Sequence, residues 1–252
     1  MEVHRHPIAI GSHTDRKRFK HYLWEFLMLF LAVFCGFLAE NQREHIVEKK
    51  RAKEYARSLV HDLSNDTSML SDYIKGVPVY VGKYDSFLLI HRNLKTAYTG
   101  QLYYYSSFVN TMSDFTSNVS TLDQIKNSGS LRYFDPVLQD KISEYARLVD
   151  RNKDYKPFAL PIHERAVALA SKIFDAEIYF FDPLRRRDRP TDSFLHTNFP
   201  LINRDTTLMK EFSNTVMAKK KVEQNMLAVY YTPGYKLAKE LITLLNAKYH
   251  FK

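Results

Sequence analysis

Apolar and polar positions divide the first quarter of the chain into two unlike stretches. The stretch 26–39 contains 14 residues without a charged side chain, and nine of them are Leu, Phe or Val. Residues 22–24 extend this apolar run to 18 residues if Glu25 is included. A helix needs about 17–25 such residues to cross a bilayer. The pattern therefore predicts a transmembrane helix over residues 22–39, preceded by a basic tail over residues 1–21.

The composition of the run favours insertion into lipid. Its nine Leu, Phe and Val side chains make the free energy of membrane insertion more favourable by about 3 to 5 kcal/mol in total. A carboxylate costs about 2.5 to 3.5 kcal/mol at the bilayer centre, but Glu25 lies near the boundary, where the cost is smaller. Tyr22 and Trp24 stand where a belt of interfacial aromatic residues is expected. We predict Tyr22, Trp24 and Glu25 at the membrane interface, with the lipid bilayer as a partner.

Other interpretations of the apolar run stay open. The basic stretch "DRKRFKH" before the run is typical of a signal peptide, but cleavage favours small residues and Phe37 stands third before Glu40. Lipid attachment at Cys35 would follow the bulky Phe34. A buried helix of a soluble protein is the third alternative. A retained membrane anchor is the interpretation that we follow.

Beyond the run, apolar residues recur at spacings of three and four, interrupted once by Asp66. This spacing indicates a helix that packs against others along a coiled-coil-like seam. We predict a stalk helix over residues 40–75, continuous with the membrane helix and ended by Gly76 and Pro78. The seam residues that we single out as candidates for self-association, or for contact with another membrane or envelope protein, are Leu59, Leu63, Leu70 and Tyr73.

The remaining chain, residues 76–252, is predicted to form a helical bundle packed with the stalk. Only 7 glycines and 9 prolines occur in the whole chain, which favours long helices over many turns. Residues 101–118 lose the helical spacing and are expected to form a loop or a short strand. The fold class is mainly α, with helices expected at about residues 80–97, 136–152, 160–176, 206–229 and 233–249, the last pair broken or kinked at Pro233.

Three short motifs mark the ends of helices. Residues 121–124 match a capping box, and Asp135-Pro136 supplies an N-cap with proline at the first helical position. The segment Asn127, Ser128 and Gly129, followed by Arg132, allows two interpretations. Its backbone N–H groups could hold an anion, or the glycine could close a helix at its C-terminus. We favour the helix cap.

Two stretches together resemble a known family. They are "FLAENQREHIVEKKRAKEYARSLVHDLSNDTSMLSDYI" and "TLDQIKNSGSLRYF". The family comprises uncharacterised single-span bacterial membrane proteins, defined as a domain of unknown function, in which a membrane helix runs into an "EKK…EY…L…DL" helix and an "LKSSGNL"-like segment follows. The match covers roughly residues 20–150, with Ser130 where the family often has Asn. The resemblance implies a mostly helical protein of the bacterial inner membrane and brings no catalytic residue.

The net charge of +9 is spread too evenly to indicate nucleic acid as a partner. Residues 1–57 hold 11 Lys and Arg against 7 Asp and Glu, and the remaining +5 is distributed over 195 residues. Lys and Arg flank both sides of the predicted span almost equally. We favour a cytoplasmic N-terminus with the C-terminal domain outside the cytoplasm.

The sequence contains no motif for phosphate or zinc chemistry. Glycines are far apart, and no HExxH pattern occurs. Asp62 and Asp66 share a helix face, where they could bind a cation or, as we prefer, form a buried ion pair with Arg57 and Arg132. We expect no catalytic residue, no metal and no cofactor.

Three further features have an ordinary interpretation that we prefer. His4 and His6 are expected in a solvated tail, and His91 on a packed helix face. The basic run 185–189 could contact anionic headgroups but is expected in a solvated loop. The tyrosines of 103–105 and 230–231 are expected in the core or in a subunit contact.

Together these observations predict a membrane-anchored helical protein that acts in protein interaction or scaffolding. The alternative is a sensory or ligand-binding module outside the cytoplasm that works with a separate partner. An enzyme is not predicted, because no nucleophile and base occur at a diagnostic spacing.

Overall fold

Helices make up most of the chain. The computed structural model describes residues 14–179 and 192–251, and no strand occurs within these ranges. Two compact units divide the chain, residues 1–53 and residues 54–252. The predicted fold class, mainly α with a long apolar N-terminal helix, is confirmed.

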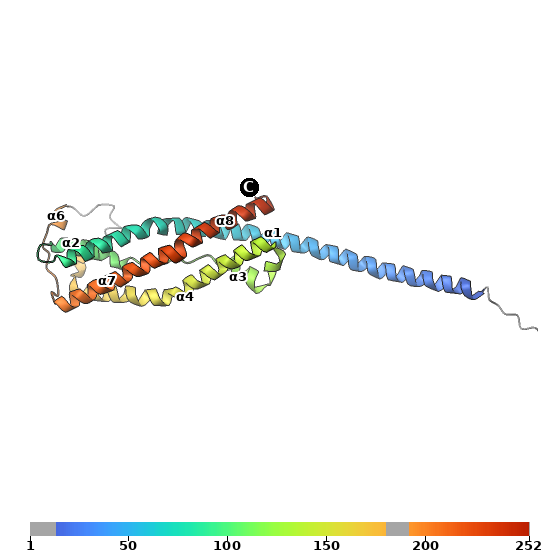
Figure 1. Cartoon of the computed structure of the whole chain (residues 1–252), viewed down its shortest axis with the longest axis horizontal. Helices are drawn as coiled ribbons and strands as arrows, with labels where there is room; N and C mark the ends of the chain where they lie inside the picture. The colour runs from blue at the N-terminus through green and yellow to red at the C-terminus, as the bar shows by residue number, and fades with distance from the viewer. Residues whose placement is uncertain (1–13, 180–191, 252) are drawn as a thin grey trace, which may run out of the picture. The chain divides into compact units, whose positions relative to one another are not determined.

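The longest element, α1, spans Thr14–Arg92 (Figure 1). The apolar run and the predicted stalk belong to this one helix, as expected. The predicted stop at Gly76 and Pro78 is wrong, because α1 continues through both residues. Pro78 has no N–H to donate to the carbonyl four residues earlier. Buried side chains on both sides, including Val77 and Tyr84, keep the helix packed across this defect.

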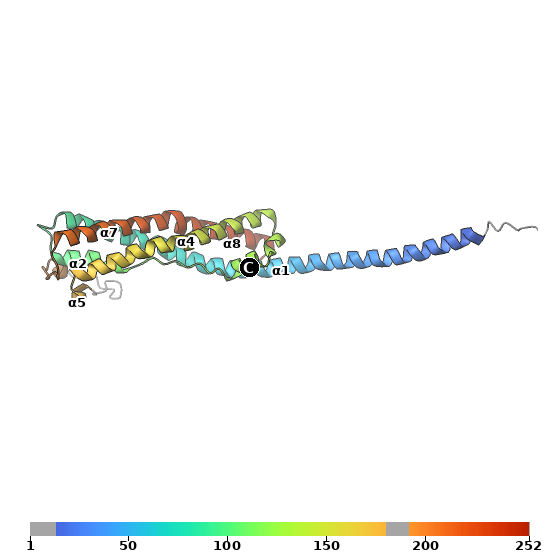
Figure 2. The same cartoon turned by 90° about the horizontal axis from the view of Figure 1, so that it is seen from below.

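The unit of residues 54–252 is a bundle of long helices. The C-terminal part of α1 packs with α4 (Pro136–Ile173), α7 (Thr206–Met226) and α8 (Thr232–Tyr249), and α4 lies along both α7 and α8 (Figures 1 and 2). One end of this bundle carries α2 (Thr99–Ser107), α5 (Ala176–Tyr179) and α6 (Asp192–Leu195), and the other carries α3 (Ser120–Asn127).

The break expected between residues 152 and 160 is absent, and the chain stays helical at Pro233, where a break or a kink was expected. Helix α4 runs through Pro157 and Pro161, so the two helices expected over 136–176 are one. Buried Val149, Ala159 and other apolar side chains line it on both sides of the prolines. At Pro233 the chain stays helical because a π-helical turn, Leu227–Tyr231, comes immediately before α8. Such a wider turn can accommodate the missing N–H of proline.

The stretch 101–118 differs from its expected form. Most of its first half is α2, followed by a 3₁₀ turn over Phe108–Asn110. Gly100 lets α2 approach α6, because a Cβ atom there would lie 2.0 Å from the Phe194 carbonyl oxygen. The aromatic and β-branched residues of this stretch fill the core, which explains why the helical spacing was not visible in the sequence.

Residues 111–119 form an extended segment without a pairing strand. Its side chains alternate, with Ser113, Phe115 and Ser117 buried and the residues between them exposed. This period of two is the pattern of a strand. We refer to residues 111–119 below as the extended segment.

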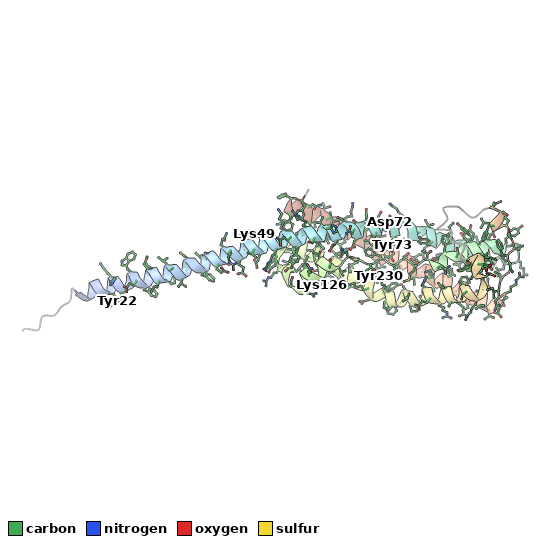
Figure 3. The ribbon with its side chains drawn as sticks, turned by 180° about the vertical axis from the view of Figure 1, so that it is seen from behind. Tyr22, Lys49, Asp72, Tyr73, Lys126 and Tyr230 are labelled. Atoms are coloured by element: carbon green, nitrogen blue, oxygen red, sulfur yellow. The ribbon has the colours of Figure 1, made fainter. Side chains whose placement is uncertain are left out.

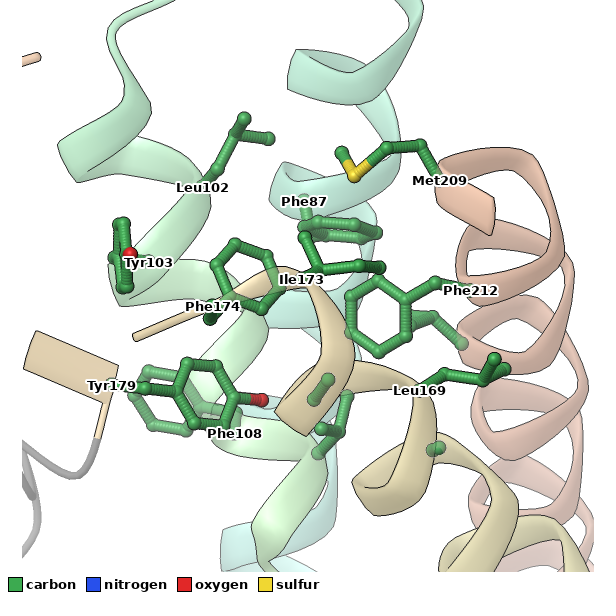
Figure 4. Close-up of a cluster of buried hydrophobic side chains, with 14 of the residues drawn as sticks. Phe87, Leu102, Tyr103, Phe108, Leu169, Ile173, Phe174, Tyr179, Met209 and Phe212 are labelled. Carbon is green, nitrogen blue, oxygen red and sulfur yellow. The ribbon is translucent and has the colours of Figure 1, made fainter. Parts of the chain in front are cut away.

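Three clusters of apolar side chains form the core of the 54–252 unit. The first is rich in aromatic rings, and Figure 4 shows them converging from α1, α2, α4 and α7. Phe87 and Phe212 meet edge to face at 5.2 Å between ring centroids, and Phe174 stacks on Tyr179 at 5.0 Å. Edge-to-face and offset pairs of this kind are favourable beyond the area they bury.

Candidate functional site

The predicted interface residues lie on α1 in the unit of residues 1–53. Tyr22 and Trp24 are 65% and 63% exposed, and Glu25 lies 3.5 Å from the imidazole of His21 one turn earlier. Figure 3 shows Tyr22 on this part of the helix. The apolar window around them has a mean hydropathy of 2.0, and none of its residues is buried. By length and composition, α1 can cross a membrane.

The predicted seam residues pack inside their own chain. Leu59 and Leu63 contact α4 and α8 in one core cluster, and Leu70 is buried in another. Tyr73 is partly buried, and its ring stacks on Tyr231 at 5.3 Å. The seam is therefore occupied by neighbouring helices of the same chain, and self-association along it stays a prediction without structural support.

The segment with the two competing interpretations has the geometry of a helix cap. Gly129 adopts a left-handed conformation with φ 67°, directly after α3. The backbone N–H of Ser128 donates to the Gln124 carbonyl, and the Ser128 hydroxyl does the same at 2.6 Å. Asn127 is exposed, and the Arg132 guanidinium lies over the Tyr133 ring. These contacts support the cap, and anion binding stays untested.

Asp62 and Asp66 hold the extended segment and the start of α3. Asp66, 1% exposed, accepts hydrogen bonds from the Ser117 hydroxyl, from the Asn118 backbone N–H at 2.9 Å and from the Tyr145 hydroxyl at 2.6 Å. Asp62 accepts from the Asn118 amide at 2.9 Å and from the Thr121 backbone N–H at 3.3 Å.

This arrangement corrects two sequence predictions. The described partners of the two carboxylates are hydroxyl and amide groups and, for Asp62, the imidazole of His61 at 3.7 Å. Arg57 is not among them, and its guanidinium lies over the Phe251 ring. The expected capping box is replaced by a hydrogen bond from a distant part of the sequence. The Thr121 N–H in the first turn of α3 donates to the Asp62 carboxylate. A carboxylate near a helix N-terminus is favourable because of the helix dipole.

A second polar group of side chains is buried between α4 and α7. Lys219 and Glu223 lie one turn apart on α7 and are 2% and 4% exposed, with 3.7 Å between the ammonium nitrogen and the carboxylate. The Lys219 Nζ is 3.0 Å from Nδ1 of His163 on α4. We call Lys219, Glu223 and the partly buried His163 the buried triad.

With Lys219 charged, its contact with His163 has only one possible hydrogen-bond direction. An ammonium group has no lone pair, so Nδ1 of His163 must accept the hydrogen bond. The other ring nitrogen is then left to donate to the Val109 backbone. Burial lowers the pKa of His163, and the nearby Lys219 ammonium lowers it further. Burial also lowers the pKa of Lys219, while Glu223 opposes that change.

A small cavity adjoins the buried triad. Residues 112–114 of the extended segment close one side, and α4 and α7 close the others. The apolar part of its lining includes Met112, Ile162 and Met226. Asp114 and Lys156, both in the lining, form an ion pair, and Asp114 is more than half exposed. Charged groups therefore meet solvent on one side of a mostly apolar cavity.

The remaining residues that the sequence analysis singled out lie as follows. His4, His6 and residues 185–189 lie outside the described residues. His91 is partly buried and stacks on Phe87, as expected for a packing residue. Tyr103 and Tyr231 are core residues, as preferred. Within residues 14–179 and 192–251, no group of three or more His, Cys, Asp or Glu side chains could hold a metal.

Sequence reasoning missed the buried triad, although a signal was present. On α7, the buried positions follow spacings of three and four, and Lys219 and Glu223 occupy two of them: Phe212, Val216, Lys219, Glu223 and Met226. A charged pair within an apolar stripe is expected to be buried and paired. Lys219 also begins the run "KKK", residues 219–221, whose composition is typical of a solvated surface.

Comparisons with protein-family models, with curated proteins and with solved structures found no match to this chain.

Proposed function

We propose that the chain is a single-span membrane protein whose 54–252 unit acts as a protein-interaction or scaffolding module. The observation that carries the proposal is the apolar window of α1, where no side chain is buried by any of the residues that the structure describes. Phe26, Phe30 and Val33 are 65%, 53% and 74% exposed. Exposed apolar surface of this extent is unfavourable in water and favourable in lipid.

Membrane extraction tests the anchor. Val33→Arg places a charge within the window, whereas Ile46→Arg places one on the same helix beyond it, at a site 60% exposed. An arginine at the centre of a membrane helix makes the free energy of insertion less favourable by about 2.5 to 3.5 kcal/mol. We expect the wild type and Ile46→Arg to resist alkaline carbonate and Val33→Arg to become extractable. Release of the wild type by carbonate would contradict the proposal.

The orientation of the span is part of the same proposal. The chain's family resemblance supports a bacterial inner membrane, and we propose that the 54–252 unit lies outside the cytoplasm. A reporter fused after Lys252, active on only one side of the membrane, tests this directly. Activity on the cytoplasmic side would reverse the orientation and leave the anchor intact.

The interaction role is supported by how the interior polar groups are used. Asp62 and Asp66 fasten one segment of the chain to another, and Lys219 contacts side chains of its own fold. The carboxylates of Asp62 and Asp66 serve the architecture, so we look for recognition on the surface of the unit. Purification in mild detergent with crosslinking should recover a specific partner or a defined oligomer by light scattering. A monodisperse monomer without partners would argue against the role.

The buried triad favours a second candidate, a sensory or ligand-binding module. Buried charged groups beside a cavity are more frequent at functional sites than elsewhere. The cavity would have to open to admit a ligand larger than water, and a thermal-shift screen of small polar metabolites against the wild type and Lys219→Met tests this. A ligand that raises the Tm of the wild type and leaves the variant unchanged would support this candidate, and a complete screen without one would contradict it.

A further inference from the structure

The cavity beside the buried triad is small and has a definite size. It offers about 20 Å³ to the centre of a water-sized sphere. About 10–15 Å³ by this measure is needed to hold one water molecule. The cavity therefore has room for one such molecule between α4, α7 and residues 112–114.

Two residues that line this cavity each have a buried side-chain oxygen without a hydrogen-bond partner among the described residues, Oε2 of Glu223 and Oγ of Ser113. Both residues line the cavity, and they are 4% and 8% exposed. A buried oxygen without a partner costs about 1–3 kcal/mol, and more for a charged group. Such atoms normally bond to protein or to ordered water.

Charge restricts what can bind there. The Lys219 ammonium and the Glu223 carboxylate balance each other at 3.7 Å, and a neutral His163, favoured by its lowered pKa, accepts the hydrogen bond from Lys219. A cation or an anion would add an unbalanced charge to a buried, mostly apolar space, which is costly. The occupant must therefore be neutral, and it must donate a hydrogen bond to the carboxylate oxygen.

We propose that this cavity is a binding site for a single water molecule, which donates to Glu223 Oε2 and bonds to Ser113 Oγ. Size admits one water, charge balance requires a neutral species, and the two unpartnered oxygens supply its partners. Water can donate two hydrogen bonds and accept two, so it satisfies both atoms at once.

The water would fasten the extended segment to α7. The backbone of Ser113 is already fixed by another contact. The Tyr231 hydroxyl donates a hydrogen bond to the Ser113 carbonyl at 3.1 Å. On the other side of residue 113, Lys156 on α4 binds Asp114 and the Thr116 hydroxyl. The water would add a link from the Ser113 side chain to the buried triad, so the segment would be tied to three helical elements near one point.

Crystallography of the full chain in detergent tests the proposal directly. At about 2 Å resolution or better, we expect one water peak within about 3.2 Å of both Glu223 Oε2 and Ser113 Oγ. In Ser113→Ala, one of its two partners is lost, and the peak should weaken or vanish while Lys219 keeps its contact with His163. A dry cavity in the wild type, or a peak coordinated as an ion, would overturn the proposal.

Methyl NMR provides a test in solution with an internal control. Met112 and Met226 line the cavity, whereas Met209 is 4% exposed within the aromatic cluster and does not line it. With ¹³C-methyl methionine, the Met112 or Met226 methyl should show a cross-peak to long-lived water that the Met209 methyl lacks. Ser113→Ala should reduce that cross-peak. Equal water contact at all three methyls, or at none, would contradict the proposal.

Discussion

The Tyr145 hydroxyl donates a 2.6 Å hydrogen bond to the Asp66 carboxylate, and both residues are almost fully buried. Tyr145 belongs to α4 and Asp66 to α1, and the same carboxylate also holds the extended segment through Ser117 and Asn118. One charged group therefore joins three parts of the bundle. Burial, together with the neighbouring carboxylate, raises the pKa of Tyr145, so the phenol stays a donor.

Removing either partner should destabilise the bundle strongly. Hydrogen bonds to a charged group contribute about 1.5–3 kcal/mol each. We expect Tyr145→Phe to lower the free energy of unfolding by about 2 kcal/mol, and Asp66→Asn by about 3 kcal/mol because an amide cannot accept from all three donors. Urea denaturation followed by circular dichroism measures both, and the double variant should lose less than the sum.

Tyr155→Phe is the matched control for the phenol. The Tyr155 ring packs against Tyr230, and its hydroxyl makes no hydrogen bond within the described residues. Loss of that hydroxyl should change the free energy of unfolding by less than about 0.5 kcal/mol. Equal effects of Tyr145→Phe and Tyr155→Phe would show that the bond to Asp66 adds nothing to stability.

The buried triad gives a second prediction about unpaired charge. Lys219→Met leaves the Glu223 carboxylate buried without its ammonium, which should cost about 3–5 kcal/mol. Lys219→Met combined with Glu223→Leu removes both charges and should recover most of that loss. The control is Lys220→Met, whose partner Asp85 is about half exposed. That change should cost about 1 kcal/mol or less.

Thermal or urea unfolding of the four proteins tests this prediction. If Lys219→Met behaves like Lys220→Met, the ammonium of Lys219 does not compensate a buried carboxylate. A double variant as unstable as Lys219→Met would instead mean that shape at this point, rather than charge, determines stability.

Local patterns in the sequence predicted the helices and several of their ends. The Asp135 side chain accepts from the Leu138 N–H at 3.1 Å at the start of α4, and Gly129 is left-handed after α3, both as expected. These features depend on residues a few positions apart, so the sequence contains the whole interaction. The continuous α1 was predicted on the same local grounds, up to Gly76.

The features that sequence reasoning missed depend on distant residues. Gly76 and Pro78 were expected to end a helix, and a gap was expected between residues 152 and 160, but tertiary packing keeps both helices continuous through their prolines. Asp66 was recognised as an interruption of the apolar seam, yet its partners lie 51 or more positions away. The triad joins residues 56 positions apart, so neither its geometry nor its cavity could be predicted from spacing alone.

Acid should weaken the contact between α4 and α7. The pKa of His163 is lowered in the folded protein relative to the unfolded value of about 6.5. Neutral His163 therefore makes its full contribution to the free energy of unfolding above about pH 6.5. This contribution is lost as the pH falls through the lowered pKa of the folded protein. Protonation would also turn Nδ1 into a donor that faces the Lys219 ammonium.

The measurement is Tm as a function of pH between about 7.5 and 5.5, a range that spans the titration of free imidazole. His163→Asn keeps an acceptor near Nδ1 and cannot titrate, so its Tm should fall less on acidification. Both proteins should carry His91→Asn, because burial also lowers the pKa of His91.

The charged groups around His163 are Lys219 and Glu223 on α7 and Glu164 on α4, with Asp114 and Lys156 on the far side of the cavity. Parallel pH profiles with and without His163 would contradict the prediction.

Two glycines should respond to alanine with opposite signs. Gly129 has φ 67°, and a Cβ atom added there would meet no atom within 4 Å. Gly129→Ala should therefore destabilise the protein by about 1–2 kcal/mol through backbone strain alone. Gly82 lies inside α1 with ordinary helical geometry, is exposed, and has equal space around it. Gly82→Ala should stabilise by about 0.5–1 kcal/mol, because alanine loses less conformational freedom on folding.

Urea unfolding of the two variants and of Gly129→Asn separates strain from chain entropy. Asparagine tolerates the left-handed conformation better than alanine, so Gly129→Asn should recover part of the loss. A gain in stability at both glycines would mean that α3 does not need a left-handed residue at its end. In that case, the geometric support for the cap interpretation of residues 127–132 would be lost, and anion binding by the same backbone would become the interpretation to test.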